Sequence, residues 1–215
     1  MNNSDLENPI LAHVASVESA AEADVEAIRS DTRDATILIV PGLGNSGPSH
    51  WQTKWLDGRF PNATRVEQDD WDHAEKDVWV RKLHEYIVSC SRKEIILVGH
   101  SLACSTIAHH ENAYPATECP KIRGALLVAP TDISVPQEGV IDFSPMELKP
   151  LGFPSIVVAS EDDPIGRFET AKMYAERWGS QFRNVGRKGH INAASGIGDW
   201  LEGLKFLREL LEMRK

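Results

Sequence analysis

The sequence predicts an α/β protein with a mostly parallel central sheet of about six strands and helices on both faces. From residue 36 onward, short runs rich in Val, Ile and Leu alternate with longer stretches whose apolar residues recur with helical periodicity. The short runs are continuously apolar, which is typical of parallel strands covered on both faces. A chain of 215 residues is long enough for one domain with a substantial core.

The predicted elements follow one another along the chain. Strands are expected at residues 36–40, 63–66, 95–98, 125–128, 155–159 and 182–185, and helices at 78–89, 102–110, 169–178 and 200–213. The proline-containing stretch 130–154 is expected to be one long surface loop that forms part of the rim of a site.

Residues 1–35 are expected to be an acidic extension, helical or partly disordered, before an α/β domain at residues 36–215. The extension holds eight acidic side chains and two arginines. Its apolar residues have the spacing of an amphipathic helix: Ile10, Val14, Val17, Ala21, Val25 and Ile28. Such a helix could dock on the domain or act as an oligomerisation arm, and the sequence leaves the oligomeric state open.

Composition excludes several classes of protein. The formal charge is −9, and no net basic surface exists to attract phosphates, so no nucleic-acid partner is expected. No apolar run approaches the roughly 20 residues of a membrane-spanning helix, so no membrane partner is expected. The three cysteines, Cys90, Cys104 and Cys119, match neither a disulfide framework nor a zinc motif. Because no targeting pattern precedes the first strand, a cytoplasmic location is expected.

The segment around Ser101 predicts a strand, a sharp turn and a helix in succession. The apolar run 95–98 leads into Gly99-His100-Ser101-Leu102-Ala103, and the predicted helix follows directly. This is the context of a nucleophile elbow, in which the turn exposes the serine hydroxyl above the sheet. Ala103 occupies a position where glycine is commonest, and its methyl group is expected to open the elbow slightly. Ser101 is therefore the predicted nucleophile.

His190 is the predicted general base. A serine at neutral pH needs a base within hydrogen-bond reach, and an acid must hold that base in one tautomer. In this arrangement the chain order is serine, acid, histidine, and His190 lies in the loop after the last predicted strand. His100 is confined within the elbow itself, while His109 and His110 lie along the following helix.

Asp163 is the predicted acid. The strand at 155–159 leads into Ser160-Glu161-Asp162-Asp163-Pro164, a loop at the carboxyl end of a strand. Pro164 restricts Asp163 to extended geometry, which helps to aim its carboxylate. Two alternatives stay open: Asp162, its neighbour, and Asp132, which follows the preceding strand.

The loop after the first strand permits two interpretations. It contains Gly42, Gly44 and Gly47 in a G-x-G-x-x-G pattern, and Glu67 follows about 20 residues later, which is the pattern of a dinucleotide-binding (NAD-dependent) oxidoreductase. However, prolines at 41 and 48 favour an irregular loop over a helix that starts inside the glycine run. We therefore favour the alternative in which the backbone N–H groups of Leu43 and Leu102 form an oxyanion hole.

The acidic segment Asp69-Asp70-Trp71-Asp72-His73 is not expected to bind a metal. No further ligand spacing in the sequence completes such a site. A solvated loop with Trp71 packed inward or lining the site is expected instead, and neither a metal nor a cofactor is predicted.

Taken together, these motifs resemble the YdeN-like family of small α/β-hydrolases, which includes retinoblastoma-binding protein nine. The resemblance covers about residues 35–211 and rests on Ile39-Val40-Pro41-Gly42, Ser49-His50-Trp51, Asp69-Asp70-Trp71-Asp72, Val98-Gly99-His100-Ser101-Leu102, Ser160-Glu161-Asp162-Asp163-Pro164 and Gly189-His190-Ile191-Asn192. It implies an α/β-hydrolase fold without a large cap domain and a triad of Ser101, Asp163 and His190. Residues 1–34 lie outside it, and Ala103 departs from the usual glycine.

The sequence thus predicts a carboxylesterase-like serine hydrolase that cleaves small esters or related acyl compounds through an acyl-enzyme, with a small-molecule acyl substrate as its partner. A non-catalytic binding protein that retains the fold is the alternative from another functional class. Thioesterase, peptidase and lactonase activities would use the same catalytic groups.

Overall fold

The computed structural model describes residues 9–117 and 121–213, with side chains from residue 15 onward. A six-stranded sheet with the order β2-β1-β4-β5-β7-β8 forms its centre, and every neighbouring pair is parallel. The strands are β1 (Ala35–Val40), β2 (Ala63–Arg65), β4 (Glu94–His100), β5 (Ile122–Val128), β7 (Ser155–Ala159) and β8 (Gln181–Asn184). The six predicted strands are all present.

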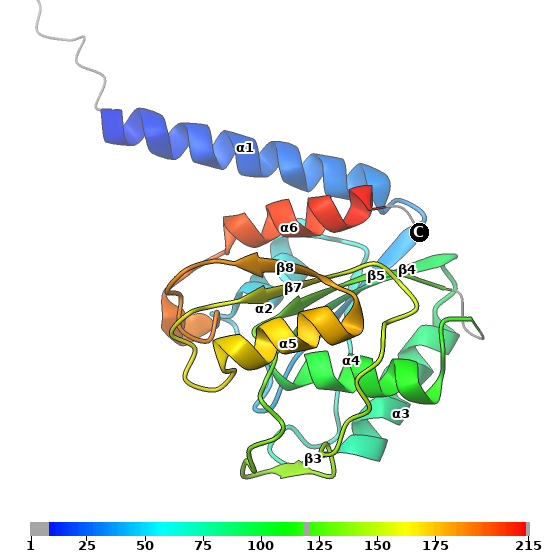
Figure 1. The fold of residues 1–215 in the computed structure, drawn as a ribbon. Helices are drawn as coiled ribbons and strands as arrows, with labels where there is room; N and C mark the ends of the chain where they lie inside the picture. Colours follow the sequence, from blue (N-terminus) through cyan, green and yellow to red (C-terminus); the bar gives the residue numbers. More distant parts are fainter. Residues whose placement is uncertain (1–8, 118–120, 214–215) are drawn as a thin grey trace, which may run out of the picture.

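Helices cover both faces of the sheet. They are α1 (Pro9–Asp31), α2 (Trp51–Lys54), α3 (Lys76–Ser89), α4 (Leu102–Ala113), α5 (Phe168–Trp178) and α6 (Leu201–Glu212), with a π-helical turn at Trp55–Arg59 and a 3₁₀ turn at Ala193–Ser195. In Figure 1, α3, α4 and α5 lie on one side of the sheet, and α6 lies on the other beneath the long α1. The expected layered α/β architecture is confirmed.

The sheet buries both of its faces. In β4, Ile95 and Leu97 pack in the cluster that includes the apolar sides of α3, α4 and α5, whereas Ile96 and Val98 pack in the cluster that includes α1 and α6. Successive side chains of a strand point to opposite faces, so a strand between two helix layers is apolar at every position. This is the physical reason for the continuous apolar runs in the sequence.

Helix α1 docks on α6. Ala21, Val25 and Ile28 are buried, while Val17 is exposed. The Arg208 guanidinium on α6 donates to Asp24 on α1 at 2.8 Å. The helix predicted over residues 10–28 is present as α1, although the side chains of residues 10 and 14 lie outside the described part. The domain boundary at residue 35 stays a prediction.

The prediction of a simple surface loop at 130–154 was incomplete. Within this stretch, β6 (Val140–Ile141) pairs in parallel with β3 (Ala74–Glu75). Phe143 is buried, and its ring packs edge-on against Trp79 of α3. The apolar side chains of this segment therefore fold it back onto the helices instead of leaving it in solvent.

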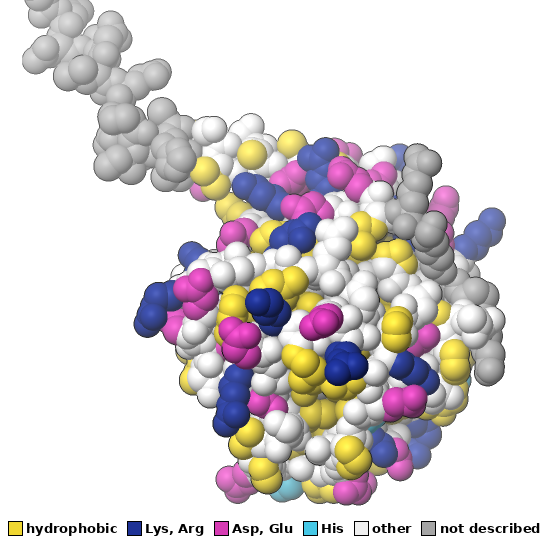
Figure 2. All heavy atoms as spheres, in the orientation of Figure 1, with side chains coloured by type: hydrophobic (Ala, Val, Ile, Leu, Met, Phe, Trp, Pro, Cys, Tyr) yellow, Lys and Arg dark blue, Asp and Glu magenta, His cyan; other side chains and the backbone are white. Residues whose placement is uncertain are grey.

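The surface carries charges of both signs. Figure 2 shows acidic and basic side chains interspersed over the visible face. Among the helices of the described ranges, none is long and apolar enough to cross a membrane. Cys90 and Cys104 are free thiols, and Cys119 lies outside the described residues.

Candidate active site

Ser101 occupies the sharp turn between β4 and α4. Its backbone has φ 59° and ψ −124°, a strained conformation for a residue with a side chain. Gly99, just before the turn, leaves room for the helix: a Cβ there would lie 2.8 Å from Ile107 Cδ1 and 3.6 Å from Ala103 Cβ. Gly99 therefore avoids a clash with Ile107, whereas the Ala103 methyl group would lie at an ordinary contact distance.

The loop after β1 comes directly against this turn at Gly42. A Cβ added at Gly42 would lie 2.8 Å from the His100 carbonyl oxygen and 2.9 Å from Ser101 Cβ. Both distances are shorter than any real contact of a Cβ. Glycine is therefore required at this position so that the two loops can approach each other.

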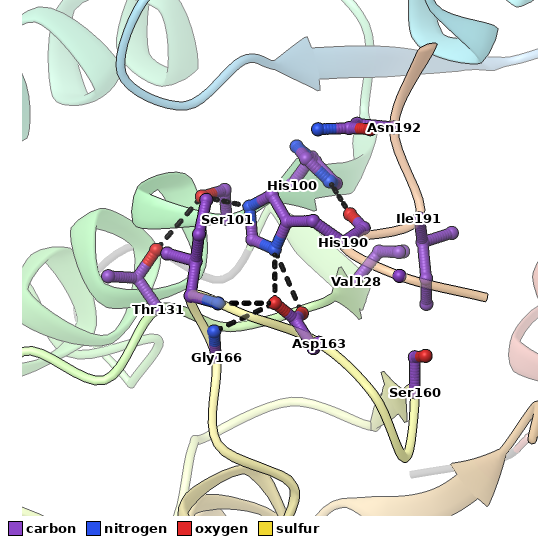
Figure 3. Close-up of polar contacts among 12 residues, drawn as sticks. His100, Ser101, Val128, Thr131, Ser160, Asp163, Gly166, His190, Ile191 and Asn192 are labelled. Atoms are coloured by element: carbon purple, nitrogen blue, oxygen red, sulfur yellow. Dashed lines mark hydrogen bonds and ion pairs between the residues drawn. The ribbon is translucent and has the colours of Figure 1, made fainter. Parts of the chain in front are cut away.

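Ser101, His190 and Asp163 form a continuous chain of hydrogen bonds (Figure 3). The Ser101 Oγ lies 2.8 Å from His190 Nε2, and His190 Nδ1 lies 2.8 Å from Asp163 Oδ2. A carboxylate only accepts, so Nδ1 carries the proton and Nε2 accepts from the serine hydroxyl. The structure thus brings together the three residues that the sequence analysis selected.

The Asp163 carboxylate is held by the backbone of its own loop. The N–H groups of Ile165 and Gly166 donate to its Oδ1 at 2.8 and 2.9 Å. Both alternative acids lie elsewhere: Asp162 accepts from the Gly189 N–H, and Asp132 accepts from Ser134 and Thr170. Only Asp163 of these three contacts His190.

Thr131 is a site residue that the sequence analysis missed. Its Oγ1 lies 2.9 Å from Ser101 Oγ, and its side chain is buried (Figure 3). Thr131 follows β5, the strand beside β4. The carboxyl ends of neighbouring parallel strands meet at one edge of a sheet, so a polar residue just after β5 was the available signal.

A cavity of about 480 Å³ opens above Ser101. Leu43 and Leu102, the predicted oxyanion donors, both line it. Leu102 is the first residue of α4, so its N–H has no acceptor within the helix. Among the described residues, the Leu43 N–H also has no hydrogen-bond acceptor. Both groups are thus available to a ligand in the cavity.

A family model described as serine hydrolase matches residues 37–209, most of the chain. The chain belongs to the serine hydrolase family. No curated protein matches the sequence.

Solved structures place this hydrolase among the YdeN-like proteins. It is similar to a protein described as a YdeN-like hydrolase from Pectobacterium atrosepticum, with 33% identity over 88% of this chain and 97% of that chain and a TM-score of 0.78. The ydeN gene product of B. subtilis aligns with 21% identity over 83% of this chain and 100% of that chain, with a TM-score of 0.67. Est1E from Butyrivibrio proteoclasticus shares the fold at 11% identity, over 83% of this chain and 89% of that chain, with a TM-score of 0.60. The predicted family resemblance and α/β-hydrolase fold are confirmed.

Two further imidazoles of the hydrolase line the cavity, His50 and His100. Burial, followed by the charges of His190 and Arg65, lowers the pKa of His50 to about 4. Burial also holds the pKa of His100 well below its usual range. His100 Nε2 donates to the His190 carbonyl oxygen at 2.9 Å and so supports the loop that carries His190. Both rings are therefore neutral at pH 7.

The glycine loop of the hydrolase is not arranged to bind a pyrophosphate. Helix α2 begins only at Trp51, after the glycine run, and His50 caps its N-terminus. The Gln52 side chain donates to the carbonyl oxygens of Val40 and Val98, which ties the loop to the ends of β1 and β4. With no helix N-terminus inside the run, the dinucleotide alternative loses its structural basis.

The acidic segment 69–73 of the hydrolase forms a local turn. Asp70 Oδ1 accepts from the backbone N–H groups of Asp72 and His73. Trp71 packs inward against Trp79, and its carbonyl oxygen accepts from the Gly44 N–H at 2.8 Å. Among the described residues, no group of three His, Cys, Asp or Glu side chains is placed to hold a metal ion.

Proposed function

We propose that this hydrolase cleaves small carboxylic esters or related acyl compounds, with Ser101 as nucleophile, His190 as general base and Asp163 as the orienting acid. The observation that carries the proposal is the unbroken path from Ser101 Oγ through His190 to Asp163, with both links at 2.8 Å. Such a path activates a serine that would otherwise be a poor nucleophile.

In the first step the Ser101 Oγ attacks the acyl carbonyl carbon and forms a C–O bond. The hydroxyl proton passes to His190 Nε2, and the carbonyl electron pair moves onto the oxygen. Asp163 stabilises the resulting imidazolium, and the Leu43 and Leu102 N–H groups donate to the oxyanion. When the tetrahedral intermediate collapses, His190 gives its proton to the departing oxygen, which leaves as the alcohol.

In the second step water hydrolyses the acyl-enzyme. His190 takes a proton from the water as it attacks the ester carbon, and the carboxylic acid departs when the bond to Ser101 Oγ breaks. The proton then returns from His190 to Ser101. No cofactor takes part in either step.

The esterase reaction is supported by the composition of the cavity and by the relatives. The cavity is lined by apolar and uncharged polar side chains, among them Leu43, Asn45, Thr131 and Gln137, which suit a neutral ester. A structural neighbour, RedJ from Streptomyces coelicolor, is described as a thioesterase, and its fold is shared at 12% identity with a TM-score of 0.59 over 82% of this chain and 90% of that chain. Thioesters are therefore the related acyl compounds to test beside esters.

Labelling with a fluorophosphonate probe, followed by turnover of p-nitrophenyl esters, tests the proposal. We expect the wild type and Ser105→Ala to be labelled, because Ser105 is a buried serine of α4 that does not line the cavity. We expect Ser101→Ala to lose both the label and about 10⁶-fold in turnover. Equal labelling of Ser101→Ala and wild type would refute the nucleophile. Labelling without turnover of any ester or thioester would leave Ser101 reactive and would favour amide substrates. Absence of labelling in the wild type would favour the non-catalytic binding alternative.

A further inference from the structure

A second, shallower cavity adjoins the one above Ser101. It has a volume of about 300 Å³, and it shares two of its lining residues, Gln137 and Ile165, with the first cavity. We call it the annex. Its lining consists of Asp132, Val135, Gln137, Pro164, Ile165 and Arg167. The two cavities therefore adjoin each other at Gln137 and Ile165.

The annex gathers aliphatic side chains that are exposed to water. Val135 and Ile165 are 39% and 41% exposed, and they are two of the five large hydrophobic side chains that are exposed among the described residues. Single exposed aliphatic residues are ordinary, but two of them together beside a reactive group indicate a surface that is covered when a ligand binds.

The cavity above Ser101 is lined by uncharged side chains. No Asp, Glu, Lys or Arg among the described residues lines the cavity above Ser101, and the imidazoles of His50 and His100 there are neutral at pH 7. In the annex, the Arg167 guanidinium lies 3.7 Å from the Asp132 carboxylate, which forms an ion pair. A charged substrate group in the cavity above Ser101 would lose its hydration without gaining an opposite charge.

We propose that the annex is the binding subsite for an uncharged apolar chain of the substrate, which extends from the ester at Ser101 across Ile165 to Val135. The inference rests on the proposed function for the identity of the ester group. It extends that function by naming the substrate class: neutral esters with an aliphatic or aryl extension, as opposed to the shortest acyl esters or to esters with a carboxylate.

The size of the expected effect follows from the transfer of methylene groups out of water. Each fully buried CH₂ strengthens binding about fourfold. A C8 chain carries four more methylenes than a C4 chain, and if two or three of them lie in the annex, octanoate should be favoured about fifteenfold to sixtyfold in kcat/KM.

The test compares p-nitrophenyl octanoate with p-nitrophenyl butyrate in three proteins: the wild type, Val135→Ser/Ile165→Ser, and the control Val17→Ser/Ile141→Ser. Val17 and Ile141 are 42% and 41% exposed, and neither lines either cavity. The control therefore replaces one valine and one isoleucine of matched exposure, as the annex variant does. We expect the octanoate-to-butyrate ratio of kcat/KM to fall about tenfold in the annex variant and to stay at the wild-type value in the control. An unchanged ratio in the annex variant would overturn the proposal.

A second arm tests charge with p-nitrophenyl hemisuccinate and p-nitrophenyl 4-oxopentanoate, which differ by a carboxylate in place of an acetyl group. We expect the neutral ester to be favoured at least about tenfold. Preference for the hemisuccinate that disappears in Arg167→Ala would instead assign the annex to an anionic group and overturn the proposal.

Binding of the intact esters to Ser101→Ala, measured by equilibrium dialysis, separates this inference from the proposed function. Turnover that does not depend on Ser101 would refute the proposed function. The annex is then judged by binding alone. Tighter binding of octanoate than of butyrate, lost when Val135→Ser/Ile165→Ser is added, supports the subsite, and equal binding of the two esters refutes it.

Discussion

Thr131 Oγ1 lies 2.9 Å from Ser101 Oγ, so the proposed nucleophile has two hydrogen-bond partners. The Ser101 hydroxyl donates to His190 Nε2, because His190 Nδ1 donates to Asp163. The remaining bond must therefore run from the Thr131 hydroxyl to a lone pair of Ser101 Oγ. Thr131 thus holds the serine in the rotamer that faces His190.

Replacement of Thr131 by valine removes this donor but keeps the shape of the side chain. We expect kcat to fall about tenfold to a hundredfold with KM within about twofold, since one hydrogen bond contributes roughly 1–3 kcal/mol. Thr131→Ser should restore most of the loss. Thr32→Val removes another buried hydroxyl, which donates to the Ile28 carbonyl oxygen and does not line the cavity above Ser101, and it should leave kcat unchanged. A Thr131→Val protein with wild-type kcat would contradict the positioning role.

Replacement of Asp163 by asparagine should lower kcat by about 10⁴-fold. The asparagine amide can donate to His190 Nδ1, which then stabilises the tautomer whose Nε2 carries the proton and cannot accept from Ser101. Asp132→Asn is the matched control, because Asp132 contacts Thr170 and Ser134 and makes no contact with His190. Steady-state turnover of a p-nitrophenyl ester measures both. A larger loss in Asp132→Asn than in Asp163→Asn would reverse the assignment of the acid.

Gly42→Ala should impair both stability and activity. Its methyl group would overlap the His100 carbonyl oxygen at 2.8 Å and push the β1 loop away from the elbow. We expect a loss of about 1–3 kcal/mol in the free energy of unfolding, measured in urea, together with reduced kcat/KM. Gly47→Ala is the control, since no atom lies within 4 Å of a Cβ added there. Equal stability of the two variants would show that the loops do not need this close approach.

Stability should decrease with acidification because of His110. Burial, followed by the charge of His84, lowers the pKa of His110 to about 4 from 6.5. Between pH 6.5 and pH 4 the unfolded chain binds a proton at His110 that the folded protein does not. Neutral His110 therefore contributes its full stabilisation of the fold above pH 6.5, and this stabilisation is lost as pH falls. The loss amounts to about 2 kcal/mol at pH 5.

The groups that face His110 are His84, whose Nδ1 lies 3.2 Å from His110 Nε2, and the ring of Tyr114. His110→Gln should reduce the difference in unfolding free energy between pH 7.5 and pH 5 by about 2 kcal/mol. His73→Gln, which changes an exposed imidazole, should leave that difference at the wild-type value. An unaltered difference in His110→Gln would mean that His110 does not titrate as its burial requires.

Local sequence was sufficient for the elements and for the order of the main site residues. The strand at 95–98, the turn at Ser101 and the helix after it are specified by neighbouring residues, because an apolar run, a glycine and a helical stripe act over a few positions. Asp163 and His190 were predictable because each follows a strand, and parallel strands bring their carboxyl ends together.

Contacts that depend on three-dimensional packing could not be predicted from local sequence. The fold of residues 130–154 was misjudged, because Phe143 finds its burial site only against Trp79 of α3. Thr131 carried no motif, and its role depends on the 2.9 Å distance that the alignment of β5 beside β4 creates.

The sequence by itself determined that this chain forms a parallel α/β sheet and places a serine, an aspartate and a histidine at its carboxyl edge. Those features arise from periodicity and from the order of strands along the chain. Only the tertiary structure decided that Asp163 and not Asp132 meets His190, that Thr131 donates to the nucleophile, and that Ile165 joins two cavities. The reason is that these relationships depend on distances of a few ångströms between loops, which the packing of the whole sheet determines.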